Sequence, residues 1–166
     1  MAERTSVADR DETPSERADR NLAELLQELR VALPGVQVLF AFLLIVPFNQ
    51  RFSEVTPVQE KVYFGVLMCT AFSAALLIAP SMNHRLLFRQ GDKDHLVKLA
   101  NKLTIAGLTL MAAAMTGVIV FITDFVLDGV VAAIAAGALA LTLIVLWYGM
   151  PLARRAKLLR EVNDTP

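Results

Sequence analysis

Four apolar stretches, each close to 20 residues long, constrain this chain more than any other feature of its sequence. They lie at about 31–48, 62–79, 103–122 and 130–148. A helix of about 20 apolar residues spans the roughly 30 Å hydrocarbon core of a bilayer. A soluble bundle would need a polar outer face on each helix, and these stretches have none. The sequence therefore predicts an all-α membrane bundle of four transmembrane helices.

The distribution of positive charge predicts how the chain sits in the membrane. Fourteen of the 16 lysine and arginine residues lie in the N-terminal segment, the second connection and the C-terminal tail. Only Arg51 and Lys61 lie in the first connection, and the third connection has none. Because lysine and arginine are enriched in cytoplasmic loops, we predict a multi-pass protein of the inner (plasma) membrane with both termini in the cytoplasm.

The N-terminal region divides into two parts before the first apolar stretch. Residues 1–20 carry six acidic residues against four arginines and few large apolar side chains, so we expect disorder there. Residues 21–33 have leucines at spacings of three and four, which predicts an amphipathic helix lying on the inner membrane surface. Pro34 and Gly35 should bend or break that helix. We expect a membrane domain over 21–151, with its second span stopping at Pro80, followed by a basic cytoplasmic tail over 152–166.

Small residues recur at spacing four in three of the four stretches, and such patterns let helices approach closely in lipid. The fourth stretch has Ala132, Ala136 and Ala140, and the third has Ala113 and Gly117. The third and fourth helices should therefore pack as an antiparallel hairpin. The first stretch lacks such a face, so it could contact lipid, another membrane protein or a second copy in a parallel homo-oligomer.

Polar residues in or near the spans suggest two candidate sites, each with a simpler explanation. Asp124 and Asp128 could form an external mouth that attracts cations, although a solvated turn that ends two helices explains them better. Gln37 could line a polar path together with a serine and several threonines. Such hydroxyls more often bond to a helix backbone. The spans contain no Asp, Glu, Lys, Arg or His.

The remaining side chains that could take part in catalysis or bind a metal predict neither catalysis nor a cofactor. The two histidines, His84 and His95, and the single cysteine, Cys69, match no metal-binding spacing. No phosphate-binding loop, dinucleotide fingerprint or catalytic triad motif is present. We therefore expect no enzymatic activity, no cofactor, no metal and no nucleic-acid partner. The basic residues after the last span should contact anionic lipid of the bilayer; these are Arg154, Arg155, Lys157 and Arg160.

Several short runs resemble one bacterial membrane family of unknown function. They are residues 24–31, 35–44 and 47–48, followed by Ala79-Pro80, His84-Arg85 and Phe88-Arg89. The resemblance covers about 19–123. It implies a small four-span protein of a largely actinobacterial family, some of whose members carry an automatic label of sodium:proton antiporter. It implies no functional residues.

Two functions fit these observations. The first is a non-enzymatic scaffold, accessory subunit or stress-related membrane component that acts through its helices and cytoplasmic surfaces. The alternative is a small oligomeric cation transporter or channel. Proton-coupled exchange normally needs a titratable group at mid-membrane, and the spans offer none, so the first function is favoured.

Overall fold

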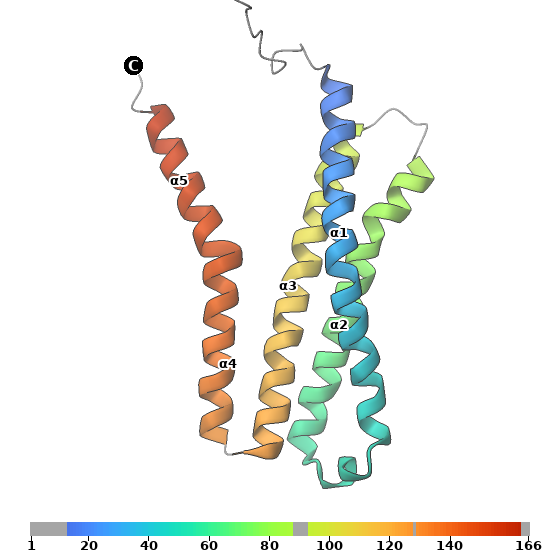
Figure 1. Ribbon diagram of the computed structural model, residues 1–166, viewed down its shortest axis with the longest axis vertical. Coiled ribbons are helices and arrows are strands. Elements are labelled where there is room, and N and C mark those ends of the chain that lie inside the picture. The colour runs from blue at the N-terminus through green and yellow to red at the C-terminus, as the bar shows by residue number, and fades with distance from the viewer. Residues whose placement is uncertain (1–12, 88–92, 128, 164–166) are drawn as a thin grey trace, which may run out of the picture.

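The computed structural model describes residues 13–87, 93–127 and 129–163 and is helical throughout these ranges apart from short connections (Figure 1). Four helices are long and apolar enough to cross a membrane, which confirms the predicted helical class. The elements are α1 (Pro14–Ile45), η1 (Val46–Phe48), η2 (Gln50–Glu54), α2 (Pro57–Leu87), α3 (Lys93–Val126), α4 (Gly129–Ile144), the π-helical turn η3 (Val145–Gly149) and α5 (Met150–Asn163).

Helix α1 begins earlier than the sequence predicted. Thr13 caps its start: the Thr13 side chain accepts a hydrogen bond from the Glu16 backbone N–H, and the Glu16 carboxylate accepts one from the Thr13 N–H at 2.9 Å. This capping box satisfies two backbone donors at the helix end. The expected disorder over 1–20 is therefore wrong for 14–20, and residues 1–12 lie outside the described ranges.

The segment 21–33 does not form a separate helix on the membrane surface. Pro34 lies inside α1, so the predicted break is absent, as is tolerated where neighbouring groups compensate for the missing N–H. Leu22, Leu25 and Leu29 are buried and share a core cluster with Leu96 of α3. The leucine stripe thus packs against protein, and the segment extends the first spanning helix instead of turning along the membrane.

Helices α2 and α3 are the most closely packed pair in the bundle. The Ser73 hydroxyl donates to the Gly107 carbonyl oxygen at 2.8 Å, and a Cβ added at Gly107 would lie 2.8 Å from Leu77 Cγ. A Cβ at Gly117 would lie 2.4 Å from Val66 Cγ2. The backbones approach this closely because glycine has no side chain. Helix α2 also continues through a buried Pro80 to Leu87, so the expected stop at Pro80 is wrong.

A second cluster closes the other end of the bundle, near η1 and η2. The Tyr63 hydroxyl donates to the Leu43 carbonyl oxygen at 2.8 Å and so joins α2 to α1. The Tyr63 ring lies 5.5 Å from the Phe52 ring and 5.7 Å from the Phe121 ring. Edge-on and tilted aromatic contacts of this kind add to the stability gained from burial.

Helix α4 is the peripheral helix. It contacts α3 but neither α1 nor α2, whereas α1 packs on both α2 and α3. In Figure 1 the rod formed by α4 and α5 stands beside the other three helices and leans away from them toward the C-terminal end. The first helix, which lacks small residues and was expected to contact lipid or a partner, packs on α2 and α3 through Leu29, Val36 and Leu43 and still exposes much of its apolar stretch.

Candidate functional site: a groove between helices α3 and α4

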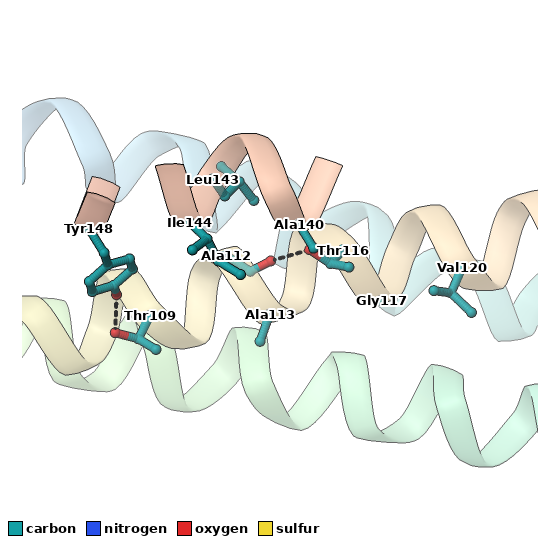
Figure 2. Close-up of a pocket in the computed structure, with 10 residues that line it drawn as sticks. All are labelled: Thr109, Ala112, Ala113, Thr116, Gly117, Val120, Ala140, Leu143, Ile144 and Tyr148. Carbon is teal, nitrogen blue, oxygen red and sulfur yellow. Dashed lines mark hydrogen bonds between the residues drawn. The ribbon is translucent and has the colours of Figure 1, made fainter. Parts of the chain in front are cut away.

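A cavity of about 470 Å³ lies between α3 and the rod of α4 and η3. Figure 2 shows side chains of both helices along it. Small residues dominate the α3 wall, where Thr109, Ala112, Ala113, Thr116 and Gly117 follow helical spacing. Small side chains on α3 leave this space unfilled even though the hairpin packs nearby through Ala132 and Ala136. Helices α3 and α4 pack as the predicted hairpin, with Ala132 and Ala136 buried, but Ala113 is exposed and Gly117 lies against Val66 of α2.

One polar contact closes the end of the groove nearest α5. The Thr109 hydroxyl and the Tyr148 hydroxyl are hydrogen-bonded to each other across the two helices (Figure 2). The Thr109 Oγ1 atom also donates to the Ile105 carbonyl oxygen at 2.7 Å, which leaves Tyr148 as the donor in the contact between them. Tyr148 therefore fixes the separation of α3 and η3 at this level.

The helix that carries Tyr148 is wound more widely than an α-helix at this point. The backbone N–H of Met150 donates to the carbonyl oxygen of Val145, five residues earlier. Pro151 explains the turn, because it has no N–H for the Trp147 carbonyl and its ring would clash with that group in a regular helix. π-Turns inside helices often occur at functional sites. After this turn α5 contacts η3 but no other described helix.

The basic residues predicted to meet anionic lipid are all on α5. Each of the four is exposed, and none is in an ion pair with a described side chain. Their helix is continuous with the last spanning helix, so the predicted tail is not a separate unit in the part that the structure describes. The four residues are Arg154, Arg155, Lys157 and Arg160.

The residues suggested as a polar path are not brought together. Gln37 is exposed on α1 and lines neither of the two cavities described here. Most of the hydroxyls donate to backbone carbonyl oxygens, as Thr70 does to Val66 at 2.8 Å. Thr104 is buried on α3, and its hydroxyl has no partner among the described residues. The other hydroxyls bound to carbonyls are Ser73, Thr109, Thr116 and Thr142.

Asp124, near the C-terminal end of α3, has a protein partner. Its Oδ2 atom accepts a hydrogen bond from Gln59 Nε2 at 2.8 Å, which ties α3 to the start of α2. Beside it, the Arg51 guanidinium lies 4.8 Å from the centre of the Phe125 ring and bonds to Glu54 at 3.2 Å. Asp128 lies outside the described residues. In this arrangement Asp124 holds α2 and α3 together at the end of the bundle that carries η1 and η2.

A second cavity, of about 520 Å³, opens at the same end of the bundle. It lies between the end of α1, the turns η1 and η2, and the end of α3. Its lining is mostly aromatic and aliphatic, with Arg51 and Asn49 as the polar members. Because Arg51 is already paired with Glu54 and Phe125, the cavity presents no free charge to a ligand.

The described residues offer no metal site. No three His, Cys, Asp or Glu side chains within 13–87, 93–127 and 129–163 come close enough together to hold an ion. His95 is exposed, and Cys69 is a partly buried thiol beside the outer core cluster.

The sequence analysis identified the small residues of the groove but not the groove itself. Thr109, Ala113 and Thr116 recur at spacings of three and four, which places them on one helix face. That pattern predicts close packing and says nothing about a space left beside it. The pairing of Tyr148 with Thr109 also depends on a π-turn, and Pro151 three residues after Tyr148 was the signal that could have indicated it.

Comparison with known proteins adds a family but no activity. The sequence model of one family, described as a family of unknown function (DUF6328), matches residues 11–151 and thus covers the first three spanning helices and most of the fourth. Neither a curated protein nor a solved structure matches the chain.

Proposed function

We propose that this chain, which belongs to the DUF6328 family of unknown function, is a non-enzymatic membrane component that acts as a scaffold or accessory subunit for another membrane protein. Its four apolar helices support a multi-pass protein. The family supplies no activity, so the proposal depends on how the helices are packed.

The observation that carries the proposal is the uncovered face of α4. This helix buries only Ala132, Ala136 and Leu143 within the described part of the chain. On its other faces Ile134 is 68% exposed and Leu141 is 63% exposed, with Val130 at 67%. A spanning helix held along one side only leaves most of its surface for lipid or for another transmembrane helix. Small residues on the free side, including Ala133 and Gly137, permit a close approach by such a helix.

Cation transport is the less supported function. The interiors of the spans carry no ionisable group, Gln37 is exposed, and Asp124 is bonded to Gln59. A proton-coupled exchanger needs a titratable group inside the membrane, so the antiporter-like alternative has no residue to carry it within one copy.

Photo-crosslinking from α4 tests the proposal. A photoreactive residue at Ile134 should crosslink to a defined membrane protein in intact cells, and that protein should co-purify with the full chain in mild detergent. The same group at Val38, which is 56% exposed on α1, serves as the control and should give little crosslinking. Equal capture from both positions, or capture of lipid alone from Ile134, would contradict the proposal.

Ion flux distinguishes the two functions independently. The purified chain in liposomes loaded with pH, sodium or potassium indicators should show no flux above that of empty liposomes. A gradient-driven flux that disappears in Gln37→Ala or Asp124→Asn would replace the scaffold proposal with transport.

A further inference from the structure

Positive charges lie on both walls of the groove just beyond its closed end. Lys102 precedes Thr109 by seven residues on α3, and Arg155 follows Tyr148 by seven residues on α5. Seven residues are two turns of an α-helix, so Lys102 lies on the same face of α3 as Thr109 and about 10 Å further along. Arg155 lies beyond the π-turn, on the first part of α5. Because Thr109 and Tyr148 are bonded to each other, Lys102 and Arg155 both lie beyond that contact, toward the same end of the molecule.

These two cations are available to a ligand. Lys102 and Arg155 are both exposed, and neither is in an ion pair with a described side chain. Lys98, one turn before Lys102, is exposed as well. Beyond η3, α5 does not contact α3, so the helices stand apart at the level of the charges. An anionic group could therefore lie between them without displacing a protein contact.

The length and lining of the groove fit one lipid chain. Its α3 wall extends from Thr109 to Val120, and the helical rise between these two residues is about 16 Å. Half of a bilayer core is about 15 Å, so the groove spans one leaflet. Apart from Thr109, Thr116 and Tyr148, its lining side chains are apolar. Thr116 bonds to the Ala112 carbonyl oxygen, and Thr109 and Tyr148 bond to each other, so no hydroxyl in the groove is left without a partner.

We propose that this groove binds one anionic phospholipid of the inner leaflet. An acyl chain lies along the small residues of α3, and the phosphate lies between Lys102 and Arg155, above the contact between Thr109 and Tyr148. Basic pockets between transmembrane helices on the cytoplasmic side are known to bind anionic headgroups. The wide turn at η3 tilts α5 away from α3 and so makes room for the headgroup. The site does not depend on the proposed protein partner, which would bind the opposite side of α4.

The only tryptophan of the chain, Trp147, provides a built-in probe. It is 37% exposed and adjoins Tyr148 at the closed end of the groove. The full chain is reconstituted in phosphatidylcholine vesicles that contain a small fraction of lipid brominated in its acyl chain. Brominated phosphatidylglycerol should quench Trp147 fluorescence more strongly than brominated phosphatidylcholine at the same mole fraction. The preference should fall by roughly fivefold for each cation removed in Lys102→Gln and Arg155→Gln.

A charge-matched control separates a site from general attraction. Arg30→Gln with Arg85→Gln removes two exposed cations of α1 and α2 at the same end of the molecule and should retain the preference for the anionic lipid. Equal quenching by both lipids in the unmodified chain would overturn the proposal. An equal loss of this preference in the Arg30→Gln/Arg85→Gln variant and in the Lys102→Gln/Arg155→Gln variant would also overturn it, because the attraction would then belong to the surface as a whole.

A groove-filling variant and a crosslink test what occupies the space. Ala113 is exposed and lines the groove, so Ala113→Phe should reduce quenching by the anionic lipid while leaving Lys102 and Arg155 in place. In a Cys69→Ala background, Ala113→Cys should not form a disulfide between two copies. Efficient dimer formation through that cysteine would show that a second copy covers the groove, and the lipid proposal would fail.

Discussion

At the scale of single residues, the α2–α3 pair depends on positions where a side chain is missing. Gly107 lies against Leu77, which is fully buried. The Gly107 carbonyl oxygen accepts a hydrogen bond from the Ser73 hydroxyl. The sequence predicted close packing from small residues in three of the four stretches, but on α2 Ala75 is exposed, and Thr70, Ser73 and Leu77 face the core. Alanine and serine spacings differ too little for the sequence alone to choose between these faces.

Replacing Gly107 by alanine should weaken this pair. The new Cβ would lie 2.8 Å from Leu77 Cγ, and a buried leucine cannot turn away without moving its neighbours. We expect Gly107→Ala to lower the free energy of unfolding by about 1–3 kcal/mol, as measured by SDS titration in mild detergent. Gly65→Ala is the matched control, because a Cβ there meets nothing within 4 Å. It should be neutral or stabilising by up to about 1 kcal/mol. Equal effects of the two substitutions would contradict the proposed close approach.

At the scale of elements, the sequence predicted the helices well and their ends poorly. The apolar stretches correspond to the C-terminal half of α1 with η1, to the central parts of α2 and α3, and to the rod of α4 and η3. The errors occurred at Pro34 and Pro80. Each was expected to end a helix, but in the structure each lies inside one. Proline removes one hydrogen bond, and a helix packed on its neighbours can tolerate that loss. Local patterns do not reveal such packing.

The N-terminal half of α1 provides a test of this correction. Leu29 of α1 is 2% exposed and belongs to a core cluster with residues of α2 and α3. Val31, two residues later, is 79% exposed. Leu29→Ala should reduce the free energy of unfolding by about 2–5 kcal/mol through the cavity it leaves. Val31→Ala should change it by less than about 0.5 kcal/mol. Similar small effects at both positions would show that this segment lies on the membrane surface, as the leucine pattern alone suggested.

At the scale of the whole molecule, the sequence predicted the number of spans but not which one is peripheral. Helix α4 is the most apolar of the four and has a stripe of small residues, yet it contacts only α3. The reason is geometric: the short connection between α3 and α4 keeps α4 beside α3, while α1 fills the groove between α2 and α3. The cavity between α3 and α4 follows from this arrangement and could not be read from the individual helices.

The charge distribution predicts that every copy inserts in one orientation. Fourteen of the 16 lysines and arginines belong to the segments assigned to the cytoplasm, so the opposite orientation would move all of them across the membrane. A C-terminal reporter active only in the cytoplasm should give a strong signal. A reporter active only outside the cytoplasm should give almost none. Comparable signals from both fusions would indicate antiparallel copies and would support an exchanger built from inverted subunits.

The central claim, that four spans place all the basic segments on the cytoplasmic side, is tested most directly by cysteine accessibility. Ser53→Cys, Ser81→Cys and Ala156→Cys are each made in a Cys69→Ala background; all three positions are exposed in the structure. In intact cells an impermeant thiol reagent should label only the cysteine at position 53, because the orientation predicted from the positive charges puts η2 outside. After permeabilisation it should label all three. Labelling at position 81 or 156 in intact cells would contradict the four-span arrangement, and with it the proposed lipid site.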